Sequence, residues 1–225
     1  MVDFLDPQPQ DVALDVAAGT GHLAKAIASR ARHVVALDLT PEMLDEGERE
    51  AEREGLKNVK FVYGDAENLP FADGVFDLVT SRFAVHHLTD PSAVVSEMVR
   101  ACRFGGKVAL IDLVAPAGEA EAASYNRLER VRDPSHVRAL SASELRGLLQ
   151  EGGLTRTRTT SRDVEVDVER WLTLSATPPA RTREIRKELG SGIAGVARTG
   201  MRPFARVGVL KFTQTWVIAL GDKAG

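Results

Sequence analysis

The sequence predicts an α/β protein built on a doubly wound, mostly parallel sheet. One observation is a strand, glycine turn and helix in succession, with apolar residues 12–16, then Gly19-Thr20-Gly21, then a helical segment to Arg30. Another is that short apolar strands and helical segments alternate through the first half of the chain. Right-handed crossovers would bring the carboxyl ends of these strands to one edge, where such sheets bind ligands.

The composition predicts a globular protein. Its length allows one or two domains, and we expect a single domain over residues 1–225. Hydrophobic residues make up 44% and charged residues 27% of the chain, and the net charge of −3 lacks the basic footprint of a nucleic-acid-binding protein. The chain contains no apolar run long enough to cross a bilayer, and its single cysteine excludes a disulfide framework. We therefore expect a cytoplasmic protein that acts on a small molecule, without nucleic acid or membrane insertion. A homodimer is left open.

The first half of the chain contains four further strands after the one at residues 12–16. Residues 33–38 form a buried strand that ends on an acid, and a helix follows with Thr40 as N-cap and Pro41 in its first position, ending at Gly55. The next strands are expected at residues 58–65, 75–81 and 107–113, with a helix that includes Cys102 over residues 91–103.

Beyond Pro116 the alternation breaks down. Helices are expected over 119–132, over a segment opened by the capping box of Ser141 and Glu144, and over 168–189 with an interruption at Pro178. Residues 155–168 alternate as an exposed antiparallel strand, and residues 206–220 read as a closing strand. The segments 116–140 and 168–200 do not fit the alternating pattern, so we interpret them as insertions that cover the substrate.

An acidic residue beside the glycine turn distinguishes between cofactors. The spacing Gly19-x-Gly21-x-x-Ala24 also satisfies the dinucleotide fingerprint and is weak evidence alone. Asp15 lies four residues before Gly19, where its negative charge would repel a diphosphate and attract a cation. S-adenosylmethionine carries an ammonium and a sulfonium but no phosphate. We therefore predict a methyltransferase that uses this cofactor.

Two more strand-end acids fit an adenosine. Asp38 can accept hydrogen bonds from both ribose hydroxyls, or it can cap the next helix; because Thr40 already supplies a cap, the ribose role is favoured. Asp65 can accept from an adenine amino group, or it can be a simple turn residue. Leu39 and Met43 could enclose the adenine, although a methionine at helical spacing is as often core.

Three histidines are candidates for the chemical step. His86 and His87 follow the fourth strand, and a neutral imidazole there could take a proton from an O–H or N–H nucleophile. Alternatively, one of them packs and the other caps a helix. His136 ends the segment 132–136, which is either a loop that contacts substrate or a solvated charged turn. No metal site is expected, because adjacent histidines point to different sides of a helix and no Glu or Cys completes a spacing.

Three motifs carry a family resemblance. Residues 15–21 (DVAAGTG), 37–44 (LDLTPEML) and 64–71 (GDAENLPF) resemble the motifs of class I S-adenosylmethionine-dependent methyltransferases, in the UbiE/COQ5-like group known as methyltransferase type 11. Residues 126–138 resemble small bacterial members of that group. The resemblance implies a seven-stranded Rossmann-like sheet with helices on both faces, in which the last strand is antiparallel.

The motifs and the resemblance together define an expected site. The resemblance implies that Arg82 and His87 face the methyl group. The expected cofactor-binding residues are Asp15, Ala17, Gly19, Thr20, Gly21, Asp38, Leu39, Met43, Asp65, Ala66 and Arg82, and the catalytic candidates are His86, His87 and His136. Two alternatives stay open. One is a protein that binds S-adenosylmethionine without transferring methyl. The other is an NAD-dependent oxidoreductase, which would leave Asp15 and Asp65 unexplained.

Overall fold

A computed structural model describes residues 1–225 and contains one eight-stranded sheet. The strands follow the order β3-β2-β1-β4-β5-β8-β6, and β7 pairs with β8 outside this path. Strands β1 to β5 pair in parallel, and β8 is antiparallel to both of its long neighbours. The sheet therefore has the mostly parallel form expected, with one short strand more than the expected seven. The bounds are β1 Val12–Val16, β2 His33–Asp38, β3 Val59–Tyr63, β4 Phe76–Arg82, β5 Cys102–Val114, β6 Leu154–Asp167, β7 Pro203–Arg206 and β8 Val209–Lys223.

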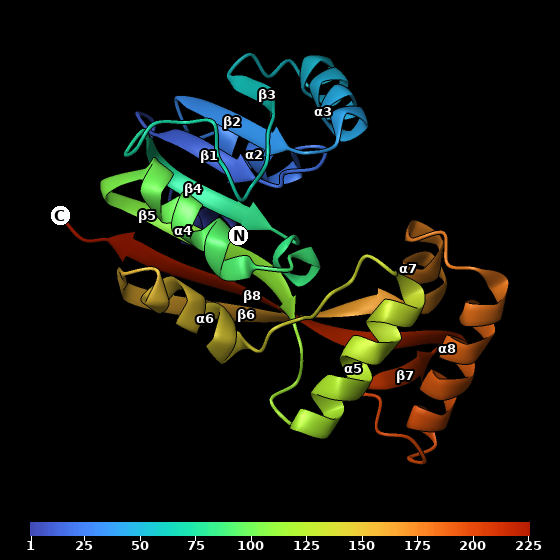
Figure 1. Ribbon diagram of the computed structural model, residues 1–225. Helices are drawn as coiled ribbons and strands as arrows, with labels where there is room; N and C mark the ends of the chain where they lie inside the picture. The colour runs from blue at the N-terminus through green and yellow to red at the C-terminus, as the bar shows by residue number, and fades with distance from the viewer.

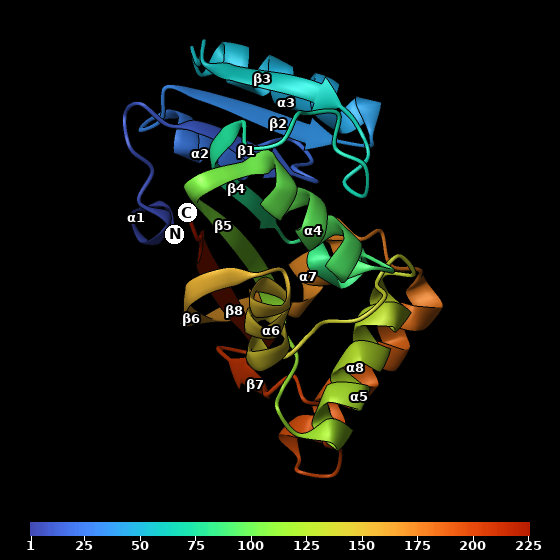
Figure 2. The same cartoon turned by 60° about the vertical axis from the view of Figure 1, so that its left-hand side comes forward.

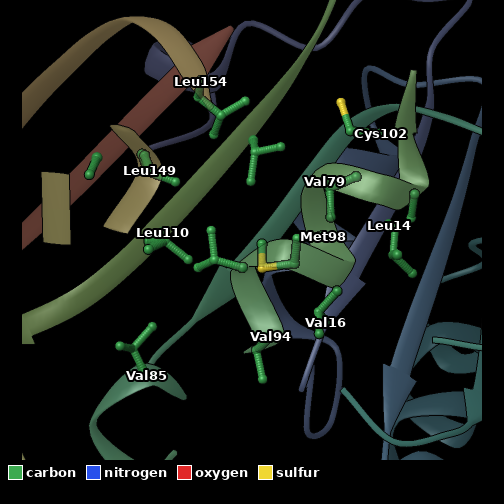
Figure 3. Close-up of a cluster of buried hydrophobic side chains, with 14 of the residues drawn as sticks. Leu14, Val16, Val79, Val85, Val94, Met98, Cys102, Leu110, Leu149 and Leu154 are labelled. Carbon is green, nitrogen blue, oxygen red and sulfur yellow. The ribbon is translucent and has the colours of Figure 1, made fainter. Parts of the chain in front are cut away.

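Helices cover both faces of this sheet (Figure 1). On one face, α4 and α6 bury their apolar sides against β4, β5 and β8 in the largest core cluster, part of which Figure 3 shows. On the other face, α1 and α2 pack against β1, β2 and β5 (Figure 2). The helices are α1 Val2–Leu5, α2 His22–Ala28, α3 Pro41–Arg53, α4 Pro91–Ala101, α5 Glu119–Arg132, α6 Ala142–Glu151, α7 Val168–Leu174 and α8 Pro179–Ile193, with a 3₁₀ turn, η1, at Val85–His87.

Strands β6 and β8 are long and extend past the last residue of β5. Their extension carries α5, α7 and α8, which Figure 1 shows grouped at the end of the molecule away from α3. These helices and β8 form a third core cluster that includes Tyr125, Trp171 and Phe212. The segments 116–140 and 168–200 lie in this region, and their role as a substrate cover stays a prediction.

The ends of several elements follow from local sequence. The Asp90 carboxylate accepts from the N–H groups of Ser92 and Ala93 at the start of α4. Ser141 and Glu144 form the expected capping box at the start of α6. The placement of Cys102 in a helix is wrong, because α4 ends at Ala101 and Cys102 begins β5 as a buried residue.

No helix in the structure combines the length and the apolar character that crossing a membrane would require.

Candidate active site

The two glycines after β1 serve different purposes. Both adopt positive φ, 57° at Gly19 and 70° at Gly21. A Cβ at Gly21 would lie 2.7 Å from the ring of Phe61, so Gly21 permits the loop to pack on this side chain of β3. A Cβ at Gly19 would meet no protein atom within 4 Å, so the open space there is available to a ligand.

Asp15 lies buried beneath this loop. Its carboxylate accepts hydrogen bonds from Thr80 Oγ1 at 2.9 Å and from the Ala24 N–H at 3.1 Å, and it ties β1 to both β4 and α2. Burial raises the pKa of Asp15 to about 7, although both hydrogen bonds oppose the shift. Asp15 is thus only partly ionised at neutral pH, so its charge argues less strongly against a diphosphate than the sequence suggests. Its contact with the cofactor stays a prediction.

Asp38 connects the glycine loop to the following helix. One carboxylate oxygen accepts from the Gly19 N–H at 2.7 Å, and the other accepts from the Thr40 N–H at 2.9 Å. Thr40 is the N-cap residue of α3 with Pro41 after it, as expected, but its side chain makes no capping bond. Asp38 instead holds the backbone N–H of Thr40. Each carboxylate oxygen can accept a second hydrogen bond, which leaves acceptor capacity for a pair of hydroxyls.

A cavity of about 260 Å³ opens in front of these groups. Asp65 Oδ1 accepts from the Glu67 N–H, and its other oxygen has no protein partner. Met43 is 46% exposed, so its interpretation as plain core is wrong. Five of the expected cofactor-binding residues line this cavity: Ala17, Asp38, Leu39, Asp65 and Ala66. Gly19 and Thr20 belong to the adjoining loop, and Asp15, Gly21, Met43 and Arg82 are not among the lining residues. The lining includes Ala17, Leu37, Asp38, Leu39, Gly64, Asp65, Ala66 and His87.

His86 forms a buried pair with Asp112 at the end of β5. The Nδ1 atom of His86 lies 2.6 Å from Asp112 Oδ1, and the His86 backbone N–H donates to the other carboxylate oxygen. A carboxylate on Nδ1 favours the tautomer in which that nitrogen carries the proton. Nε2 is then the nitrogen that can accept a proton.

The other two histidines lie against His86, with ring centroids 4.1 Å away for His87 and 5.5 Å away for His136. The expectation that adjacent histidines diverge is therefore wrong, because the His86 and His87 rings contact each other at the 3₁₀ turn of residues 85–87. His136 is buried with Nε2 at 2.8 Å from Asn126 Oδ1, so the interpretation as a solvated turn is also wrong for this residue. Burial lowers the pKa of His87, and burial, followed by repulsion from the neighbouring histidines, lowers the pKa of His136 to about 3.

Arg82 is a cation without an ionic partner. It ends β4, stacks over the Phe83 ring at 4.3 Å from the centroid, and has no acidic side chain within 4 Å. Burial lowers its pKa, while the charges of Asp15 and Asp112 act in the opposite direction. Phe83 in turn makes an edge contact with Trp216 of β8, with centroids 4.7 Å apart. The cation is therefore available to an anionic ligand.

A buried polar network that no sequence motif indicates lies beside the histidines. Gln214 donates to Tyr125 Oη at 2.9 Å and to Glu129 Oε1 at 3.3 Å, and it accepts from the indole N–H of Trp216. Glu129 is fully buried, which raises its pKa, and Oε2 lies 3.1 Å from Nε of Arg132. No local pattern joins α5 to β8, so only the fold reveals this network.

Nowhere in the structure do three or more His, Cys, Asp or Glu side chains gather in a way that could hold a metal ion.

Comparison with known proteins identifies the family. A family model described as a methyltransferase domain matches residues 14–110. YcgJ, an uncharacterized methyltransferase of Bacillus subtilis (strain 168), is 32% identical over 185 residues, which are 82% of this chain and 73% of YcgJ. The chain belongs to the class I methyltransferases.

Solved structures show the same fold as this methyltransferase over nearly the whole chain. The crystal structure of YcgJ superposes with a TM-score of 0.90 at 28% identity, and covers 100% of this chain and 97% of that one. A structure from Bacillus halodurans C-125 gives a TM-score of 0.91 at 30% identity with the same coverage. The UbiE C-methyltransferase of ubiquinone and menaquinone biosynthesis from Ruegeria sp. (strain TM1040) is 38% identical over 50% of this chain and 46% of its own length. The methyltransferase is thus UbiE-like, with YcgJ as a full-length relative.

Proposed function

We propose that this methyltransferase uses S-adenosylmethionine to methylate a small-molecule acceptor. The observation that carries the proposal is the hydrogen bond from the Gly19 N–H to Asp38, which fixes the glycine loop beside the 260 Å³ cavity. The residues fit the cofactor, because Gly19 leaves room for a ligand and the acids offer acceptors without a cluster of cations for phosphate.

Each end of the cofactor has a chemically suitable partner. Asp38 would accept from the ribose hydroxyls, and the free oxygen of Asp65 would accept from the adenine amino group. Leu39 and Met43, both exposed, supply apolar surface for the adenine ring. Arg82, which has no ionic partner, would bind the carboxylate of the methionine moiety.

When bound, S-adenosylmethionine supplies a sulfonium methyl group, whose bond electrons return to sulfur as the acceptor's electron pair forms the new bond. The chain's own part is to align the acceptor and exclude water. For an acceptor that bears an O–H or N–H, Nε2 of His86 receives the proton, and Asp112 stabilises the resulting imidazolium. His87, which lines the cofactor cavity and has a lowered pKa, stays neutral beside the sulfonium.

Calorimetric titration with S-adenosylhomocysteine, with NAD as the second ligand, tests the cofactor. We expect micromolar binding of S-adenosylhomocysteine alone. Asp38→Asn should weaken it ten- to a hundredfold, because a charge-assisted hydrogen bond contributes about 1.5–3 kcal/mol. Glu151→Gln, at the exposed end of α6, is the control and should change nothing. Binding of NAD instead, or no effect of Asp38→Asn, would overturn the proposal.

Turnover distinguishes an enzyme from a protein that only binds the cofactor. Phenols, small acids and amines should be offered with S-adenosylmethionine, and formation of S-adenosylhomocysteine should be followed. Turnover of one acceptor class supports the proposed reaction. Tight cofactor binding without turnover on any class would instead favour a sensor.

A further inference from the structure

A second cavity, of about 470 Å³, lies on the sheet face that carries α1 and α2. Its volume is within the usual range of small-molecule sites. None of its lining residues belongs to the cofactor cavity. Its lining includes Phe4, Ile111, Thr160, Arg162, Trp216 and Ile218.

The register of strands β5, β8 and β6 determines which side chains form the floor of this cavity. Ile111 of β5 pairs with Ile218 of β8, and Ile218 pairs with Thr160 of β6. One step further along, Trp216 pairs with Arg162. Side chains that pair across adjacent strands lie on the same face about 5 Å apart. The floor is therefore a flat apolar and aromatic surface that ends at a guanidinium on the edge strand β6.

Arg162 is the unbalanced charge of this cavity. It is exposed and has no acidic side chain within 4 Å. The nearby charged side chains are paired: Asp3 with Arg30, Arg158 with Asp222, and Asp163 with Arg202. The cavity consequently has an unpaired guanidinium beside an apolar floor, and it suits an apolar anion.

The other end of the floor reaches the carboxyl edge of β4. Trp216 contacts the ring of Phe83, which lies under the Arg82 guanidinium. Arg82 is also the direct neighbour of Ile111 in the parallel pairing of β4 with β5. A molecule that lies along the floor from Arg162 would thus direct its far end to the edge where the proposed function places the methyl donor.

We propose that this cavity is the acceptor site, and that the acceptor is a flat apolar molecule with a carboxylate. The carboxylate binds Arg162, the body lies on Trp216 and Ile218, and the nucleophilic atom is directed to the Phe83 end. This assignment rests on the proposed function, whose substrate class it names. Arg82 is assigned to the cofactor carboxylate, so Arg82 and Arg162 bind two different anions.

Two matched probes test the site: 2-naphthoate, and its neutral analogue 2-naphthamide. Dissociation constants are measured by NMR titration of the full chain, both free and saturated with S-adenosylhomocysteine. We expect naphthoate to bind in both states. Arg162→Gln should weaken naphthoate about tenfold and change naphthamide less than twofold. Arg170→Gln, which also removes an exposed arginine without an ionic partner, should leave both probes unchanged.

A second variant fills the cavity instead of removing the charge. Thr160→Trp lies on the exposed edge strand and suits a β conformation, so we expect it to fold. It should abolish the binding of both probes and leave the affinity for S-adenosylhomocysteine unchanged. This variant distinguishes the cavity itself from a nonspecific attraction to a surface arginine.

Three outcomes would overturn the acceptor site while the proposed function stands. In the first, the protein binds S-adenosylhomocysteine but not naphthoate. In the second, S-adenosylhomocysteine displaces naphthoate. In the third, Arg162→Gln changes the dissociation constants of the two probes equally. Absence of S-adenosylhomocysteine binding would overturn the proposed function, and with it the role as acceptor site. The same probe titrations on the free protein would then show whether the cavity binds an apolar anion at all.

Discussion

The carboxyl group of Asp15 makes the free energy of unfolding fall as the pH rises, whereas a salt-bridged acid makes it rise. Its pKa is raised by burial from 3.8 to about 7. The unfolded chain therefore loses this proton at lower pH than the folded one. The stability linked to Asp15 is fully present below about pH 3.8 and is lost as the pH rises towards 7.

Asp15→Asn removes this dependence. The amide oxygen can accept from the Ala24 N–H, and the amide NH₂ can donate to Thr80 Oγ1 once the Thr80 hydroxyl donates to the Leu14 carbonyl instead. Between pH 5 and pH 8 we expect the wild type to lose about 2.5 kcal/mol of unfolding free energy relative to the variant. Urea unfolding at the two pH values measures this difference. A constant difference would show that Asp15 titrates near its ordinary pKa.

His86→Gln tests the proton acceptor. The glutamine amide can still donate to Asp112, but it cannot take a proton from an acceptor. For an O–H or N–H acceptor found by the turnover screen, we expect kcat to fall at least about a hundredfold with unchanged affinity for S-adenosylhomocysteine. His87→Gln is the matched control and should reduce kcat less. Equal losses in the two variants would contradict the assignment of the base to His86.

At the scale of elements, the two glycines of the loop between β1 and α2 have different roles: Gly21 is needed for folding, and Gly19 for the proposed cofactor binding. Gly21→Ala combines a positive φ with a contact 2.7 Å from the Phe61 ring, so we expect it to destabilise the fold by about 2–4 kcal/mol. Gly19→Ala introduces strain only through the positive φ, so we expect it to destabilise the fold by about 1–2 kcal/mol. Its Cβ points into open space, so its larger effect should be on cofactor affinity. Urea unfolding and S-adenosylhomocysteine titration of both variants measure the two effects, and identical profiles would refute this division.

Sequence patterns predicted correctly those helices, strands and caps that are encoded by residues close together in the chain. The strand that ends on Asp38, the capping box at Ser141 and the break before Pro179 are each encoded within a few positions, and each is found in the structure. The alternation of strands and helices also gave the parallel sheet, because crossover handedness leaves few arrangements.

Contacts between distant parts of the chain were not predictable in this way. Trp216 reaches Phe83 because β8 inserts between β5 and β6, and no local pattern encodes that insertion. Asp112 looked like one more strand residue until the 3₁₀ turn placed His86 against it. The burial of Asp15, which changes its ionisation, likewise follows from packing and not from its spacing to Gly19.

At the scale of the whole molecule, the core is divided unequally. Two clusters, of 22 and 13 buried residues, lie on the two faces of the sheet, and a third of 12 residues joins α5, α7 and α8 to the end of β8. The third cluster lies at the end of β5 and beyond it, so few central strands support it. Local opening costs least where apolar burial is smallest and least connected to the rest.

We therefore expect α5, α7 and α8 to open as one unit before the central sheet unfolds. Native-state hydrogen exchange at low denaturant should show amides of Leu128 and Leu189 exchanging together, at a lower free energy than those of Leu14 and Val79. Leu189→Ala should lower protection throughout this unit and leave β1 and β4 unchanged, because its buried side chain packs only within the third cluster. Exchange of all these amides at one common free energy would instead mean that the long strands β6 and β8 couple the three clusters into a single cooperative unit.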